Sequence, residues 1–310
     1  MKRTICYQES KASGLMLGMV FGNALGAFFN DKNPNDIPPL DTDFFQQNPL
    51  RYYTADIQTA LSVLEEMGEN SQIDQMSLQQ RFIKRFSPWR GYAGGLLEVI
   101  NKWKDGIPIA VAAGQIYNGT GNFGDGAAVR SGPISLFFRE NEFTELFEQV
   151  TRNALMTHTH PYGIAGAQLL ASAVLLALNG FTAEAWLEPI FKLPLESAFK
   201  IKLGQVVCCL EDSMSHSECA RLIGNGAEAI EAVPAALFAA IKHSDSVVDA
   251  VGCAISMGGD TDTIAAMTGA IVGAYHGIDG IPVHYLQNVE KNNEGIEFIE
   301  KLITKYRREK

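Results

Sequence analysis

The segment at residues 256–263, SMGGDTDT, places two carboxylates and two hydroxyls directly before an apolar, alanine-rich run. Two glycines turn the chain, and the spacing that follows predicts a helix over 263–275. Oxygen ligands this close together suit a hard cation such as Mg²⁺. Asp and Thr are also ordinary residues at the start of a helix. The pattern alone leaves two interpretations open: a cation or ligand site, or a helix with several capping residues.

Three other segments carry residue types that suit the same kind of ligand. Thr54 and Asp56 stand just before and at the start of a helix expected from Ile57. The loop at 119–130, GTGNFGDGAAVR, offers backbone N–H groups to phosphate or ribose oxygens, but it lacks the GK[ST] ending of a Walker loop and also fits a plain turn. The histidines of THTHP, at 157–161, have no cysteine or acidic residue at a matching spacing, so we interpret them as structural or ligand-contacting.

Most of the chain has the periodicity of helices. The pattern predicts helices at 57–67, 76–86, 93–103, 143–155, 163–178, 182–191, 217–223, 225–240, 245–254 and 263–275. Gly14, Gly18, Gly22 and Gly26 recur every four residues and share one face of a further helix. Each glycine costs a helix roughly 1 kcal/mol relative to alanine, so this face must lie close to another helix or to a ligand. Without strand patterns or linkers, we predict one all-α, orthogonal multi-helix domain over 1–310.

Composition excludes several classes of partner. The chain has 310 residues and a net charge of −10, which argues against nucleic acid, because phosphate neutralisation needs a basic face. The N-terminus is a poor secretory signal, and the longest apolar stretch, 164–178, is too short for a membrane span. Five cysteines without a CxxC pair suggest reduced thiols. We expect a cytoplasmic monomer, although signals for delivery into another cell are not readable from sequence.

Taken together, the segments resemble the ADP-ribosylglycohydrolase family, also called the DraG or ARH family, and within it the ARH3-type branch. The resemblance covers about residues 11–290. The segments that carry it are GLMLGMVFGNALGAFF, RYYTADIQTAL, RGYAGG, GNFGDGAAVRSGPISLFF, MTHTHPYGIAGAQLLASAVLLAL, GNGAEAIEAVPAALF and SMGGDTDTIAAMTGAIVGAYHG. The resemblance implies an all-α fold with a cleft for two Mg²⁺ ions, which orient ADP-ribose for hydrolysis at its anomeric carbon.

The resemblance also implies site residues. Positions that match the family's metal ligands are Thr54, Asp56, Asp260, Asp262 and Thr263. The three aspartates among them are the implied catalytic residues. Positions implied to contact ADP-ribose are Asn122, Phe123, Gly124, Asp125 and Gly126 in the diphosphate loop, His158, and Tyr275 on the helix after the metal motif.

Several positions depart from the family pattern. Ala55 stands where the family has the middle aspartate of its Thr-Asp-Asp run, and Ile57 replaces the usual threonine. Asn23 and Asn30 stand at positions where the family has acidic residues, whereas Asp125 replaces an asparagine. Two nearby divalent ions need several carboxylates to offset their repulsion. We therefore expect at most one tightly bound Mg²⁺ ion, or none.

Three functions remain open at this stage. The first is an ADP-ribosylhydrolase with reduced or absent Mg²⁺ dependence that acts on modified protein side chains, with arginine favoured over serine. The second is an inactive protein that binds ADP-ribose or an ADP-ribosylated partner. The third is a recruited structural protein. Asp260 and Asp262 would repel each other unless a cation lies between them, and their retention favours the first two functions.

Overall fold

The computed structural model describes residues 3–40, 42–291 and 293–307. The ends of the predicted domain, residues 1–2 and 308–310, lie outside the described residues, as do positions 41 and 292. Within the described part, the chain forms seventeen α-helices and five short 3-10 turns, and its β structure is limited to three isolated bridges. The predicted all-α fold is confirmed.

All the helices predicted from sequence are present, with ends that differ by a few residues. The α-helices are α1 (Glu9–Gly26), α2 (Thr42–Gln47), α3 (Ala55–Asn70), α4 (Gln75–Arg85), α5 (Gly94–Lys104), α6 (Ile109–Gly114), α7 (Gly126–Val129), α8 (Phe143–Ala154), α9 (Pro161–Leu178), α10 (Ala183–Phe191), α11 (Ser197–Glu211), α12 (His216–Ile223), α13 (Ala229–Lys242), α14 (Val247–Ser256), α15 (Thr261–His276), α16 (Val283–Leu286) and α17 (Ile296–Tyr306). The sequence pattern did not reveal α2, α6, α7, α11 or α16.

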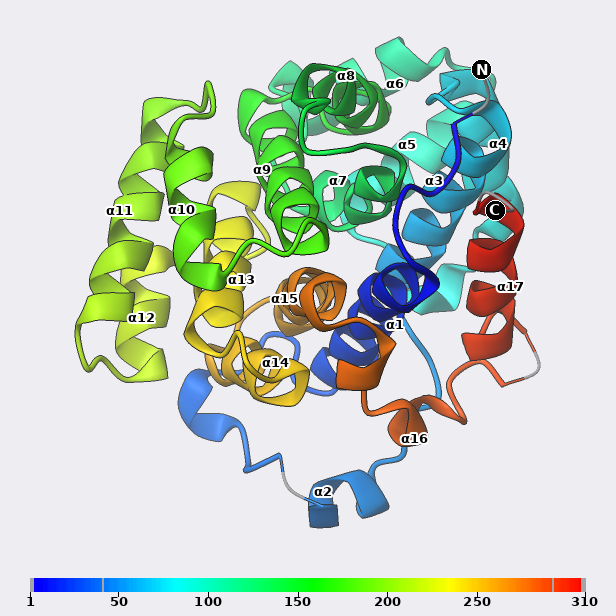
Figure 1. Cartoon of the computed structure of the whole chain (residues 1–310). Helices are drawn as coiled ribbons and strands as arrows, with labels where there is room; N and C mark the ends of the chain where they lie inside the picture. Colours follow the sequence, from blue (N-terminus) through cyan, green and yellow to red (C-terminus); the bar gives the residue numbers. More distant parts are fainter. Residues whose placement is uncertain (1–2, 41, 292, 308–310) are drawn as a thin grey trace.

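Two glycine-rich helices, α1 and α15, lie side by side at the centre of the molecule (Figure 1). A Cβ atom added to Gly18 would lie 2.2 Å from the carbonyl oxygen of Gly269, and one added to Gly22 would lie 2.0 Å from that of Ala265. Real Cβ atoms do not approach backbone so closely, so the two backbones are in direct contact. This confirms the expected close approach and identifies another helix as the partner.

The remaining helices surround this pair. The long apolar helix α9 contacts α7, α8, α13 and α15. Length and composition alone would allow α9 to cross a membrane, but 78 % of it is buried inside the protein, which makes that weak evidence for a span. The start of the described chain lies beside its end, because the N–H of Ile5 donates to the carbonyl oxygen of Tyr306 at 2.9 Å.

Candidate active site

A cavity of about 270 Å³ opens where the first turns of α3 and α15 meet the glycine-rich loop. The predicted site residues that line it are Thr54, Asp56, Asn122, Phe123, Gly124, Asp125, Gly126, His158, Asp260, Asp262 and Thr263. Asn30 and Ala55, two of the positions that depart from the family pattern, also line the cavity. The fold therefore brings together segments more than 200 residues apart in sequence.

Two glycines set the position of Asp260. Gly258 and Gly259 have φ values of 70° and 75°, in the left-handed region that favours glycine. A Cβ on Gly259 would lie 2.0 Å from the carbonyl oxygen of Asn225, which accepts the N–H of Asp260 at 2.9 Å. Only glycine allows this turn, which carries the chain from α14 into the start of α15 at the cavity.

Asparagines contribute to the hydrogen bonding of helix starts that the sequence assigned to aspartate and threonine. Thr54 and Asp260 occupy the N-cap positions of α3 and α15, but neither makes a side-chain capping bond. Asn30 Oδ1 accepts the N–H of Asp262 at 2.9 Å, and Asn23 Oδ1 accepts the N–H of Thr54 at 2.7 Å. Asp262 Oδ1 also accepts the N–H of Thr263 at 3.0 Å, so Asn30 and one cavity carboxylate share the capping of α15. The capping interpretation thus accounts for Asp262 but not for Asp260.

Asp56 joins the two helix starts. Its Oδ2 atom accepts the hydroxyl of Thr263 at 3.0 Å, the hydroxyl of Thr54 at 3.4 Å and the side-chain N–H of Asn23 at 3.3 Å. Three of the positions matched to metal ligands thus share one oxygen atom. Asn23, where the family resemblance implies an acidic residue, keeps this position polar without adding charge.

The carboxyl groups of this site disfavour one another's ionisation. Burial, and then the charge of Asp262, raise the pKa of Asp56 to about 7 and that of Asp260 to about 8. Burial and Asp260 also hold the pKa of Asp125 well above its ordinary value. Asp125 Oδ2 is buried with no hydrogen-bond partner among the described residues. Clustered oxygen atoms without a neutralising partner fit a hard divalent cation.

One position of the implied two-ion site offers no metal ligand. Ala55 is 5 % exposed, lines the cavity at the first turn of α3, and offers only a methyl group. Asn23 and Asn30 are engaged in hydrogen bonds to backbone and hydroxyl groups. Asp56, Asp260 and Asp262, with the hydroxyls of Thr54 and Thr263, would hold Mg²⁺. Asp125 adds a fourth carboxyl group to the same cavity.

The glycine-rich loop is held in place by its own side chain and by the segment before α13. Asn122 Oδ1 accepts the N–H of Gly124 at 2.8 Å. The N–H of Asp125 donates to Ala227 at 3.0 Å, and Phe123 accepts the N–H of Ala229 at 3.0 Å. These bonds explain why α13 begins at Ala229 rather than at the predicted position 225. Two loop N–H groups that suit an anion are therefore already engaged inside the protein.

His158 presents a neutral ring to this loop. Burial, and then the charge of Arg130, lower the pKa of His158 well below its ordinary value. The Thr157 hydroxyl accepts from Arg130 at 2.7 Å and lies 2.7 Å from His158 Nδ1, so its own hydrogen is available to that nitrogen. This arrangement assigns the ring proton to Nε2, 3.7 Å from where a Cβ on Gly124 or Gly126 would lie. Nε2 is thus a donor at the loop.

The structure does not bring Tyr275 to the cavity. Tyr275 lies near the end of α15, whereas Asp262 lies at its start, and the helix between them is roughly 20 Å long. Its ring packs against Trp186, with a centroid distance of 6.0 Å. Tyr117 lies at the cavity instead, with its ring 5.5 Å from that of Phe123.

Sequence reasoning missed Tyr117, and its conformation explains why. Tyr117 and Asn118 have φ values of 50° and 57°, which bulky residues rarely adopt. Tyr117 is 49 % exposed at the cavity, so the strained turn presents an aromatic face beside Phe123. The only signal in the sequence is the aromatic residue shortly before the glycine-rich loop. Arg130, the last residue of the glycine-rich segment, was also missed; its guanidinium donates to the Thr157 hydroxyl beside His158.

Comparison with known proteins identifies the family to which this fold belongs. The model of the ADP-ribosylglycohydrolase family matches residues 7–310, and the chain belongs to this family. It is 27 % identical to human ADP-ribosylhydrolase ARH3, over 92 % of this chain and 90 % of that protein. It is 23 % identical to the ADP-ribosylarginine hydrolase Tri1 of Pseudomonas putida (strain GB-1), over 90 % of this chain and 74 % of that protein.

A solved structure shows the same fold. It is described as an ADP-ribosylglycohydrolase-related protein complex and matches with a TM-score of 0.76 at 21 % identity. The match covers 96 % of this chain and 97 % of that one. The all-α architecture around the cavity is therefore that of the family.

Without a metal ion, the protein should lose stability as the pH rises from 6.5 to 8. The raised pKa values of Asp56 and Asp260 mean that the folded state retains protons that the unfolded state has released. Stability from these neutral groups is complete below about pH 4 and is lost as pH passes the folded pKa values, by up to about 1.4 kcal/mol per pH unit for each group. His158, with its lowered pKa, opposes this trend only below about pH 6.5.

Melting temperatures in EDTA across this pH range measure the effect. Saturating Mg²⁺ should reduce the loss, because the ion favours the ionised carboxylates of the folded state. A melting temperature in EDTA that stays constant or increases from pH 6.5 to 8 would contradict the prediction.

Proposed function

We propose that this protein hydrolyses the bond between ADP-ribose and a modified protein side chain, with arginine preferred over serine and at most one tightly bound Mg²⁺ ion. The observation that carries the proposal is the cavity itself, where Asp56, Asp260 and Asp262 converge with the hydroxyls of Thr54 and Thr263. Burial and the neighbouring charge of Asp262 disfavour the ionised forms of Asp56 and Asp260, a cost that a bound cation or a cationic transition state would offset. Membership of the ADP-ribosylglycohydrolase family supports the same chemistry.

The cavity suggests how this chain's residues would act. The loop residues Phe123 and Gly126, with the Nε2 donor of His158, would bind and orient the diphosphate end of ADP-ribose. Asp56 and Asp262 would face the positive charge that develops on the ribose as the anomeric bond breaks. A bound Mg²⁺ ion would supply further charge to orient the ribose and its leaving group.

The preference for arginine follows from the reduced number of metal ligands. A guanidine leaving group is basic and departs after protonation by a side chain, whereas a serine alkoxide needs more stabilisation as it leaves. Ala55 removes one carboxylate that would otherwise hold a second ion for that purpose. Tri1, one of the relatives, is described as an ADP-ribosylarginine hydrolase.

The decisive experiment is incubation with arginine-linked and serine-linked ADP-ribosylated proteins, in Mg²⁺ and in EDTA. The proposal expects release of ADP-ribose from the arginine linkage, with part of the activity retained in EDTA. Loss of all activity in EDTA, with full recovery in Mg²⁺, would contradict the reduced metal dependence. Faster release from serine would contradict the linkage preference.

A second function, ADP-ribose binding without hydrolysis, is favoured by the loss of the carboxylate at Ala55 while the loop and His158 remain in place. It predicts that saturating ADP-ribose raises the melting temperature while neither linkage is cleaved. This combination would replace the hydrolase proposal. Absence of both cleavage and a thermal shift would support the structural role instead.

Ala55→Asp should strengthen Mg²⁺ binding at least about fivefold. Two unit charges 4 Å apart interact by on the order of 1 kcal/mol in water and 4 kcal/mol near a protein surface. The first turn of α3 should accept the new carboxylate, since helix N-termini favour negative charge. Calorimetric titration of Mg²⁺ measures the change. Ala55→Asn is the matched control, with the same size and no charge. Equal strengthening by both variants would show that charge is not the cause.

A further inference from the structure

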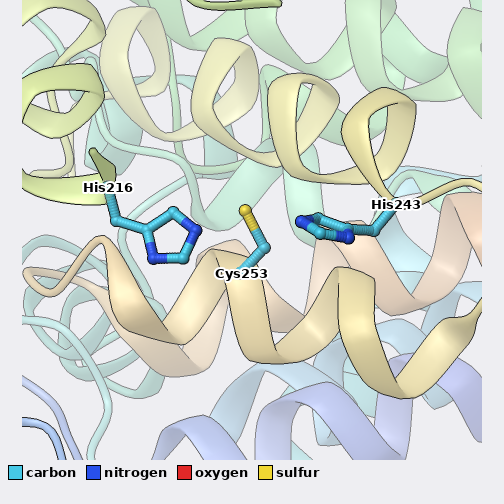
Figure 2. A group of neighbouring side chains, drawn as sticks. All are labelled: His216, His243 and Cys253. Atoms are coloured by element: carbon cyan, nitrogen blue, oxygen red, sulfur yellow. The ribbon is translucent and has the colours of Figure 1, made fainter. Parts of the chain in front are cut away.

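A second group of metal-ligating side chains lies where α12, α13 and α14 meet. His216 begins α12, His243 directly follows α13, and Cys253 lies on α14. One ligand atom from each lies within 4.8 Å of the other two. Figure 2 shows the sulfur of Cys253 between the two imidazole rings. None of the three lines the aspartate cavity.

We propose that His216, His243 and Cys253 form a Zn²⁺ site. Two imidazole nitrogens and one thiolate are ligands that favour zinc, whereas Mg²⁺ and Ca²⁺ prefer oxygen. Zn–N and Zn–S bonds of about 2.1 and 2.3 Å in a tetrahedron place ligand atoms roughly 3.5 Å apart. The observed separations, within 4.8 Å, are close enough for side-chain rotation to complete the site.

The three side chains are not held by hydrogen bonds to other described residues. Within the described residues, none of them makes a side-chain hydrogen bond, although Cys253 is only 3 % exposed. Burial, and then Lys242 and His243, lower the pKa of His216, so its lone pairs remain available near neutrality. Burial raises the pKa of Cys253 to about 12, so this thiol needs a cation to become a thiolate. A zinc ion would supply that cation and the missing contacts.

A cavity of about 440 Å³ adjoins the three ligands. Its wall includes apolar residues of the segment 37–40, together with Phe45 and the carboxylate-bearing Asp249. Because all three ligands line this cavity, an ion that they hold would face it with its fourth coordination position. A Zn²⁺ ion with three protein ligands and one open position also binds water or a small anion. Asp249 adds negative charge to a region that otherwise contains Lys242.

Cobalt substitution tests this site independently of any hydrolase activity. The full-length protein, freed of metal by EDTA, is titrated with Co²⁺ in saturating Mg²⁺, which occupies the aspartate site. We expect a thiolate-to-cobalt charge-transfer band that saturates at one ion per chain and disappears when Zn²⁺ is added. Zn²⁺ alone should raise the melting temperature, since it binds the folded state.

Variants identify the ligands. Cys253→Ser should abolish the charge-transfer band, whereas Cys208→Ser, at an exposed cysteine of α11, should leave it unchanged. Outer-shell changes weaken metal binding about 10–100-fold, so loss of a direct ligand should cost at least about tenfold. His216→Gln, at a partly exposed position, should therefore lower Zn²⁺ affinity at least about tenfold, whereas His284→Gln, at an exposed histidine, should not.

Three results would overturn the proposal. The first is the absence of a charge-transfer band in the unmodified protein. The second is a band that survives Cys253→Ser. The third is equal Zn²⁺ affinity in the His216→Gln and His284→Gln proteins, which would identify an adventitious ion only. If Cys253→Ser fails to fold, as judged by circular dichroism, the comparison of the two histidine variants still decides the question.

Discussion

Asp56→Asn should reduce hydrolysis of ADP-ribosylated protein by about 10²–10³-fold, the loss typical when one preorganised group facing transition-state charge is removed. Asp56 Oδ2 is the atom that joins Thr54 and Thr263, and asparagine keeps the size of the side chain while it removes the charge. The same change should not reduce stability. The raised pKa of Asp56 shows that its ionised form is disfavoured by burial and by Asp262.

Asp56→Asn should therefore lower activity without lowering stability, as expected where a functional site is kept at a cost in stability. Single-turnover kinetics measure the loss of activity, and melting in EDTA at pH 8 measures stability. Asp105→Asn, at an exposed aspartate after α5, is the matched control and should change neither. If Asp56→Asn retains activity within about threefold of the unmodified protein, a role for its charge in the reaction would be excluded.

Gly18→Ala should destabilise the protein by about 3 kcal/mol or more, at the upper end of the range for overpacked cores. The new Cβ atom would lie 2.2 Å from the carbonyl oxygen of Gly269 and 3.3 Å from the Cα of Gly273. Both obstacles are backbone atoms of α15, so no side-chain rotation can relieve the clash. The helices must separate, which also moves Asp262 at the start of α15 relative to Asn23 on α1.

Gly204→Ala is the control, and it should increase stability where Gly18→Ala decreases it. Gly204 lies within α11, and a Cβ atom there would meet no atom within 4 Å. Replacement should stabilise the helix by up to about 1 kcal/mol, because alanine has the higher helix propensity. Denaturant unfolding measures both variants. A Gly18→Ala protein as stable as the original would show that the backbones of α1 and α15 are not in direct contact.

Local sequence patterns predicted the parts of this structure that depend on local rules. The four glycines of α1 required a close neighbour, and the SMGGDTDT segment required a turn before a helix; both are present. Thr54 and Asp260 were correctly placed at helix starts. Family resemblance then predicted that these segments form one site, which their spacing along the chain did not indicate. The periodicity of α3 and α15 thus located the site's elements.

The remaining features depend on contacts between distant segments. In the sequence, Asn23 and Asn30 were notable only because they lack a charge, but their carbonyl oxygens accept the N–H groups of Thr54 and Asp262. Tyr117 adopts a left-handed conformation that no local rule favours, and Tyr275 lies far along a helix whose start forms the site. The His216–His243–Cys253 cluster joins three helices, so its spacing along the chain carries no metal-binding signature.

The pairing of α1 with α15 has a consequence for synthesis of the protein on the ribosome. The hydroxyl of Thr261 donates to the carbonyl oxygen of Gly26, across a sequence separation of 235 residues. At about 5–20 residues per second, the partner of α1 emerges roughly 10 to 50 s after α1 itself. During that interval α1 exposes Leu15, Phe21 and Leu25, all buried in the finished fold, and four glycines weaken it as an isolated helix. Nascent chains should therefore depend on holding chaperones until nearly the whole sequence has been translated.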